Sequence, residues 1–356
     1  MIDFTKYPIN KFKAYGGDNG KKIAIEYDGE IYMLKLPPIM SATSKLLKNA
    51  ATYKNACISE YLGCHIYESM GFDTQKTLYG KYLVDGKEKE AVACKDFSVN
   101  GYVLLEFSKL KNACFEKSNE NSAGYRTELQ QILDAIDSQQ LVSAKMLKEY
   151  FWDMFIADAF LGNFDRHNGN WGILVNENLQ KAEIAPVYDC GSCLYPQVNE
   201  KGMEEILSDP AEVAQRIFVF PTSAIKFNDK KINYFDFISN NINQDCTEAL
   251  FRVIGKIDID KIKAIINDTS FLSEIKKRFY ITILEQRKER ILDFSWKKIN
   301  SFESKICSGR YRLSQLCDIA EEEFHWDKDT AKQRIQGLKK TPRYRNMECM
   351  QQGQAK

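Results

Sequence analysis

The chain has 356 residues, of which 44% are hydrophobic and 28% are charged. This composition is typical of a globular protein and excludes a disordered or collagen-like chain. Lys and Arg number 50 against 49 Asp and Glu, so no charge bias indicates nucleic acid or an anionic membrane as the main partner of the core. The length favours two packed subdomains or one large bilobal unit.

The N-terminus, the hydropathy and the cysteines indicate the cellular setting. The first residues, MIDFTKYPINKFKAYGG, lack the apolar centre of a signal peptide, and no apolar stretch reaches the ~20 residues of a membrane span. We therefore expect synthesis in the cytosol and no membrane span. Ten cysteines are scattered along the chain, which favours reduced thiols. Cys190 and Cys193 form a single CxxC beside only three histidines, so we expect no zinc site.

Alternating hydrophobicity predicts a β-rich N-terminal lobe. KKIAIEY and IYMLKL flank Asp28-Gly29, and TLYGKYLV and KEAVACKDF are joined at Asp85-Gly86-Lys87, so each pair predicts an antiparallel hairpin. Between the hairpins, apolar residues recur at helical spacing from Ile58 to Met70, and Gly71 follows, which predicts one amphipathic helix. We assign residues 1–100 to this nucleotide-binding lobe.

The rest of the chain predicts mainly helices. KMLKEYFWDMFIADAFLG predicts a nearly buried helix that ends at Gly162. We assign residues 101–307 to a helical lobe with the catalytic and metal-binding loops, and residues 308–356 to a helical appendage. From Asp327 onward, eight Lys or Arg oppose three Asp or Glu. The appendage is either a solvated helical hairpin with a frayed tail or an element that binds nucleic acid or a partner.

The residues after Gly162 carry a pattern typical of phosphoryl transfer. That reaction needs oxygen ligands for Mg²⁺ and a carboxylate that orients or deprotonates the acceptor hydroxyl. Asp165 opens D-R-H-N-G-N, and Asn170 follows it by five positions, the separation of the catalytic aspartate and the metal-binding asparagine in protein kinases. Asp189 lies in PVYDCGS, in a D-x-G turn like the kinase D-F-G. An amide and a carboxylate suit Mg²⁺.

Two side chains of the N-terminal lobe are candidates for nucleotide binding. Lys35 lies on the second strand between two leucines that point to the other face. It would reach the nucleotide phosphates, or it is a solvent-facing lysine. Glu60, on the following helix, would pair with Lys35, or it is an exposed helix glutamate. The sequence leaves these alternatives open.

Two backbone segments complete the candidate nucleotide site. A glycine-rich turn before the first strand would cover the phosphates with its amides, and its residues are Gly16, Gly17, Asn19, Gly20 and Lys21. The segment Ala93 to Phe97 joins the sheet to the helices. This is the position at which the hinge of a kinase offers backbone hydrogen bonds to adenine. We assign Ala93, Cys94 and Lys95 to that contact. The order of all these elements along the chain is that of a kinase.

The run LGNFDRHNGNWG, followed by PVYDCGS, resembles the HipA-like family of bacterial serine/threonine kinases, most of all its cell-translocating branch. The resemblance covers roughly residues 1–300. It implies a bilobal α+β, protein-kinase-like fold related to that of phosphatidylinositol kinases, with ATP and Mg²⁺ as cofactors. It also implies Asp165 as the catalytic aspartate, Asn170 and Asp189 as metal ligands and Lys35 as the nucleotide lysine.

Two features of the resemblance remain open. His167 has a counterpart in the lipid-kinase loop, where a role in the transition state is considered. In this chain His167 has either that role or a packing or hydrogen-bonding role. HipA itself has a regulatory serine in its glycine-rich loop, and this chain has none there. The nearby hydroxyls Ser41, Thr43 and Ser44 are the alternative sites for phosphorylation.

The resemblance implies a serine/threonine protein kinase that phosphorylates itself or another protein. A lipid or small-molecule kinase with the same site is one alternative, and a nucleotide-binding signalling module without catalysis is another. A silent module has no chemical need for a base and two metal ligands, which argues against it. Passage into host cells is an expectation by analogy with the cell-translocating branch. The sequence does not determine the substrate, the oligomeric state or any antitoxin partner.

Overall fold

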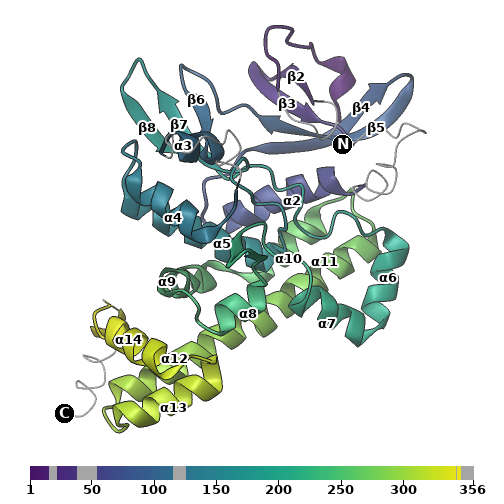
Figure 1. Cartoon of the computed structure of the whole chain (residues 1–356). Helices are drawn as coiled ribbons and strands as arrows, with labels where there is room; N and C mark the ends of the chain where they lie inside the picture. Colours follow the sequence, from purple (N-terminus) through teal and green to yellow (C-terminus); the bar gives the residue numbers. More distant parts are fainter. Residues whose placement is uncertain (16–21, 38–53, 115–125, 342, 346–356) are drawn as a thin grey trace, which may run out of the picture.

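A computed structural model of the chain describes residues 1–15, 22–37, 54–114, 126–341 and 343–345. Its N-terminal part is a five-stranded sheet with the strand order β1-β4-β5-β3-β2, at the top of Figure 1. The strands are β1 (Ile2–Asp3), β2 (Lys22–Tyr27), β3 (Glu30–Lys35), β4 (Thr77–Val84) and β5 (Lys87–Lys95). A short 3₁₀ helix, η1 (Phe4–Lys6), follows β1.

Both predicted hairpins are present in this sheet. Two-residue turns join β2 to β3 and β4 to β5. Asp28 and Gly29 have φ angles of 51° and 75°, and Asp85 and Gly86 have φ angles of 50° and 75°. Positive φ at both central residues is the backbone of a type I′ turn, which matches the twist of the strands it joins. Asp-Gly adopts this backbone readily, so the local sequence is sufficient to specify the two hairpins.

Helix α2 (Ala56–Ser69) lies beneath the sheet (Figure 1) and packs against β4 and β5. Ile58, Leu62 and Ile66 are at most 1% exposed, which confirms the predicted helix. These residues belong to one apolar core shared with the helices below, whereas the other face of the sheet has a small separate core. The helix that carries Glu60 is therefore held by the helical part, and the main core continues across the predicted boundary at residue 100.

The remainder of the chain is mostly helical and contains two small sheets. One has the order β6-β7-β8, and β9 and β10 form a ribbon. The strands are β6 (Val103–Glu106), β7 (Gly172–Asn176), β8 (Lys181–Ile184), β9 (Lys226–Phe227) and β10 (Lys230–Lys231). The helices are α3 (Phe107–Cys114), α4 (Leu129–Ser138), α5 (Ala144–Leu161), α6 (Glu200–Ser208), α7 (Pro210–Phe218), α8 (Tyr234–Ser239), α9 (Gln244–Val253), η3 (Ile254–Lys256), α10 (Ile259–Asp268), α11 (Glu274–Arg287), the π-helical η4 (Lys288–Asp293), α12 (Phe294–Cys307), α13 (Leu313–Phe324) and α14 (Lys328–Leu338).

Helix α5 is the buried support of the segment that follows it. Its side chains Phe151, Trp152 and Phe155 are at most 2% exposed, as the apolar sequence predicts. Ser143 caps its N-terminus by accepting the Met146 N–H. Gly162 ends it with a φ of 68°, a left-handed backbone that glycine adopts without steric cost. The chain therefore leaves the core directly into D-R-H-N-G-N.

The C-terminal helices α13 and α14 form a small packed unit with α12, at the bottom of Figure 1. Trp326 is 3% exposed, and its Nε1 donates to the Asn240 carbonyl at 2.9 Å. Arg334 donates to the Ile242 carbonyl at 2.5 Å, and Arg343 pairs with Glu303 at 2.5 Å. Two residues of the basic end are thus held by internal contacts, so up to residue 345 the unit is more tightly packed than a solvated hairpin.

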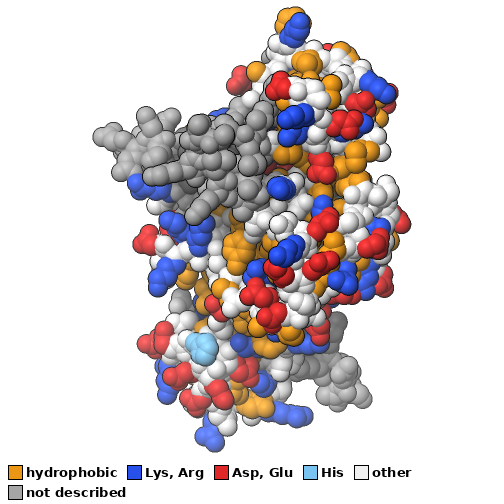
Figure 2. All heavy atoms as spheres, turned by 90° about the vertical axis from the view of Figure 1, so that its right-hand side faces the viewer, with side chains coloured by type: hydrophobic (Ala, Val, Ile, Leu, Met, Phe, Trp, Pro, Cys, Tyr) orange, Lys and Arg blue, Asp and Glu red, His pale blue; other side chains and the backbone are white. Residues whose placement is uncertain are grey.

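The described surface carries charges of both signs. Figure 2 shows acidic and basic side chains interspersed over one face of the molecule, which agrees with the 50 basic and 49 acidic residues of the chain. Among the described helices, none combines the length and the apolar character that a membrane span requires.

Candidate active site

The loop after α5 is held by bonds between its own residues. The Asp165 N–H donates to Asn163 Oδ1 at 3.0 Å, and the Asp165 carbonyl accepts the His167 N–H at 2.8 Å. The Asn170 side-chain Nδ2 donates to that same carbonyl at 2.8 Å. This bond uses the amide nitrogen of Asn170 and leaves its oxygen available as a ligand. Asp165 and Asn170 are thus brought together as their spacing predicts.

Lys35 joins the N-terminal sheet, α2 and the D-x-G turn. Its Nζ lies 3.0 Å from Glu60 Oε2 and 2.9 Å from Asp189 Oδ1. The side chains of Lys35 and Glu60 are 17% and 2% exposed. Lys35 and Glu60 are therefore not the solvent-exposed side chains that the sequence left open as alternatives. A residue on β3 thereby meets two carboxylates that lie 25 and 154 positions away in the sequence.

The electrostatics of this cluster favour the charged forms of Lys35 and Asp189. Burial alone would lower the pKa of Lys35, but Asp189 and Glu60 raise it well above its usual range. Burial alone would raise the pKa of Asp189, but the charge and the hydrogen bond of Lys35 lower it below its usual value. Burial raises the pKa of Asp165 against the opposing effect of His167. Asp189 is therefore suited to hold a cation, and Asp165 to accept a proton.

Two glycines allow α2 to approach the D-x-G turn closely. A Cβ on Gly63 of α2 would lie 2.7 Å from the Cβ of Cys190, and a Cβ on Gly191 would lie 3.2 Å from Glu60 Oε2. The first distance is shorter than real side chains tolerate. Gly63 is therefore needed for packing of the turn against α2. Gly63 was not predicted from the sequence, where its only signal is that a glycine interrupts an apolar helix.

Comparisons with known proteins show the family to which this chain belongs. A curated serine/threonine-protein kinase, CtkA of Helicobacter pylori (strain J99 / ATCC 700824), is 47% identical over 293 residues, which are 82% of this chain and 86% of that protein. The chain belongs to the HipA-like family of serine/threonine-protein kinases. No family model matches the kinase.

Solved structures extend the comparison to the fold. The crystal structure of a Helicobacter pylori proinflammatory kinase CtkA matches with a TM-score of 0.75 and 46% identity, over 83% of this chain and 98% of that chain. The kinase therefore has the mixed α+β architecture expected from its sequence, with a small sheet region and a helical majority. A HipA from Shewanella oneidensis MR-1, solved with HipB and operator DNA, has a TM-score of 0.44 and 13% identity over 82% of this chain and 70% of that chain.

The backbone of Ala93, Cys94 and Lys95 is engaged within the sheet, which argues against the adenine contact predicted for these residues. All three lie in β5, which is paired with β4 on one side and β3 on the other. The Lys95 carbonyl, beyond the β4 ladder, accepts Gln75 Nε2 at 2.9 Å. The connector between β5 and β6 comprises residues 96–102. Within the described residues, no hydrogen bond engages the backbone of Phe97 in this connector. We therefore move the expected adenine contact to Phe97.

The predicted glycine-rich turn falls outside the described residues. This holds for Gly16, Gly17, Asn19, Gly20 and Lys21, and also for Ser41, Thr43 and Ser44. The residues just before the turn are anchored to the connector. Tyr15 donates its hydroxyl to Asp96 Oδ2 at 2.8 Å, and Lys13 pairs with Asp96 at 2.6 Å. Lys13 and Tyr15 are therefore held beside Asp96.

His167 supports the backbone of its own loop. Its Nδ1 accepts the Gly169 N–H at 3.0 Å, which places a proton of the neutral ring on Nε2. This bond agrees with the hydrogen-bonding role that the sequence left open for His167. A role in the transition state stays a prediction.

The residues present fit Mg²⁺. Across the described parts of the chain, no group of three or more His, Cys, Asp and Glu could hold a metal ion. Mg²⁺ in kinase sites is held by one or two protein groups together with the phosphates and water. Asn170 and Asp189 offer one amide oxygen and one carboxylate, which is the donor set that such binding needs.

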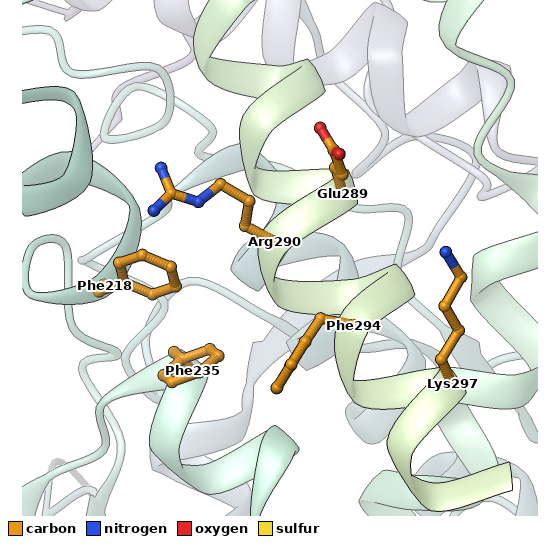
Figure 3. A pocket seen from close by; sticks show the side chains of 6 residues that line it. All are labelled: Phe218, Phe235, Glu289, Arg290, Phe294 and Lys297. Carbon is orange, nitrogen blue, oxygen red and sulfur yellow. The ribbon is translucent and has the colours of Figure 1, made fainter. Parts of the chain in front are cut away.

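Two surface hollows lie away from these residues. One, of about 340 Å³, is lined by Phe218, Phe235, Glu289, Arg290, Phe294 and Lys297. Figure 3 shows Arg290 reaching toward Phe218, with Phe235 and Phe294 below them; the guanidinium is 4.5 Å from the Phe218 ring centroid. The other, of about 320 Å³, adjoins the connector. Asp165, Asn170 and Asp189 line neither hollow.

Proposed function

We propose that the kinase transfers the γ-phosphate of ATP, with Mg²⁺, to a serine or threonine hydroxyl of a protein, and that it phosphorylates itself. The observation that carries this proposal is the position of Lys35, 3.0 Å from Glu60 and 2.9 Å from Asp189. Protein kinases require an ion pair between a strand lysine and a helix glutamate, together with the aspartate of the D-F-G turn. The D-R-H-x-x-N form of the loop supports a relation to the phosphatidylinositol kinases.

Each residue has a chemical part in this proposal. Mg²⁺, when bound, neutralises charge on the phosphates. Asn170 and Asp189 would hold it, and Lys35 would position the phosphates by its charge. Asp165 would orient the acceptor hydroxyl and take its proton, because burial gives that carboxylate a raised pKa.

The proposed acceptor is tested by labelling. Purified protein is incubated with labelled ATP and Mg²⁺, alone, with a protein extract and with a lipid extract. We expect label on serine or threonine in the protein alone and in the protein extract. Label confined to lipid would replace this proposal with the lipid-kinase alternative. Passage into host cells is also a proposal, supported by the resemblance to the cell-translocating branch.

Asp189→Ala should weaken binding of Mg²⁺ with a nonhydrolysable ATP analogue by about tenfold or more, because the metal loses its carboxylate ligand. Without Mg²⁺, the same variant should bind the analogue at least as well as wild type, because a negative charge is removed and Lys35 is released. Asn170→Ala should act in the same direction with a smaller effect. Calorimetry with Mg²⁺ and with a chelator measures both; equal losses under the two conditions would count against a metal-ligand role.

A further inference from the structure

A fully buried ion pair lies beneath the catalytic loop. Arg166 and Asp158 are 2% and 1% exposed, and Arg166 Nε lies 3.1 Å from Asp158 Oδ2. The other oxygen of Asp158 accepts the Tyr67 hydroxyl of α2 at 2.6 Å and Asn163 Nδ2 at 2.8 Å. The pair therefore connects α5, α2 and the start of the catalytic loop.

Further donors of Arg166 reach the two metal-binding segments, which are the segments that carry the proposed Mg²⁺ ligands Asn170 and Asp189. Its Nη1 donates to the Asn170 carbonyl at 2.8 Å and to the Tyr188 carbonyl at 2.5 Å, and its Nη2 lies 3.7 Å from Cys190 Sγ. Tyr188 and Cys190 are the neighbours of Asp189 on either side. One guanidinium thus contacts the backbone of one proposed Mg²⁺ ligand and both neighbours of the other.

The backbone of Asp189 is left-handed, with a φ of 55°. Asp adopts this conformation more readily than most non-glycine residues, and the contacts of Arg166 with both neighbours of Asp189 hold it in this position. Stability alone does not account for the Arg166–Asp158 pair, because buried ion pairs are often no more stabilising than apolar residues of similar volume. The direction of the Arg166 donors, toward the two metal-binding segments, does account for it.

We propose that Arg166 is a positioning residue that sets the separation of Asn170 and Asp189, and that Asp158 and Tyr67 extend this control to α2. The planar fork of arginine is required, because one ammonium cannot reach both carbonyls and Asp158 in these directions. The proposal rests on the proposed roles of Asn170 and Asp189 as Mg²⁺ ligands.

The test compares Arg166→Lys with Arg287→Lys. Arg287 is also fully buried and donates to the Ala159 carbonyl of α5 at 2.9 and 2.7 Å, but it contacts neither metal-binding segment. Calorimetry measures the affinity for a nonhydrolysable ATP analogue with Mg²⁺ and with a chelator, and thermal unfolding is measured on the same samples. We expect Arg166→Lys to weaken Mg²⁺-dependent binding about tenfold or more, in the range of second-sphere effects on metal sites, and to leave binding in chelator within about twofold.

The control variant should lose thermal stability without a change in Mg²⁺ dependence. An Arg166→Lys protein with normal Mg²⁺ dependence, or an equal change in both variants, would overturn the positioning role. If Arg166→Lys does not fold, Tyr67→Phe replaces it; that change removes the hydroxyl on Asp158 and should weaken Mg²⁺-dependent binding about two- to fivefold, and no change there would also overturn it. A wild-type protein with no Mg²⁺ dependence would refute the proposed metal ligands and this role together.

Discussion

Asp165→Asn should lower phosphoryl transfer by about 10³-fold or more, while nucleotide affinity and thermal stability stay close to wild type. The reason is that the carboxylate acts on the acceptor hydroxyl. The loop is held by the Asp165 backbone, through its N–H to Asn163 and its carbonyl to His167 and Asn170. Asparagine keeps all three bonds, so the variant removes the base and retains the loop.

This result is measured as incorporation of label from ATP with Mg²⁺, beside calorimetry of nucleotide binding. Asp134→Asn is the matched control, because Asp134 is a helix aspartate whose carboxylate accepts the side-chain amide of the neighbouring Gln130. The control should keep wild-type turnover. Wild-type turnover in Asp165→Asn would remove Asp165 from the mechanism, and a loss of nucleotide affinity equal to the loss of turnover would assign it to binding.

Lys35→Ala should lower self-phosphorylation by about 10²-fold or more, because the ammonium that positions the phosphates is lost. Arginine should not restore it. The Nζ of Lys35 fits between Glu60 and Asp189 at 3.0 and 2.9 Å, and a planar fork cannot occupy the place of a compact ammonium. The measurement is the intact mass of the protein after incubation with ATP and Mg²⁺.

Two controls separate chemistry from folding in this experiment. Lys81→Ala removes a different strand lysine, which pairs with Glu88 on the neighbouring strand, and should leave the added phosphate unchanged. Lys35→Ala also leaves Glu60 buried without its partner, which can cost about 3–5 kcal/mol of stability, so thermal unfolding is recorded for every variant. No added phosphate on wild type, or equal phosphate on wild type and Lys35→Ala, would defeat the prediction.

Local sequence determined the elements whose partners lie close by in the chain. The Asp-Gly turns specify the two hairpins because their left-handed backbone is decided by two residues. The apolar stretch that ends at Gly162 specifies α5, because both the apolar residues of the helix and the glycine that ends it lie in one short segment. The spacing of Asp165 and Asn170 was informative because one short loop holds both residues. Their catalytic and metal-binding roles stay predictions.

Only the tertiary structure decided the contacts between distant segments. The choice between an exposed and a paired Lys35 depends on Asp189, which lies 154 positions away. The sequence did not indicate that the segment from Ala93 to Lys95 has strand neighbours on both sides, because strand order is a property of the whole sheet. Arg166 shows the same limit: the sequence contains its motif, but the partners of a buried guanidinium follow from how α2, α5 and the D-x-G turn pack together. Packing of that kind depends on many distant residues at once, so no local pattern encodes it.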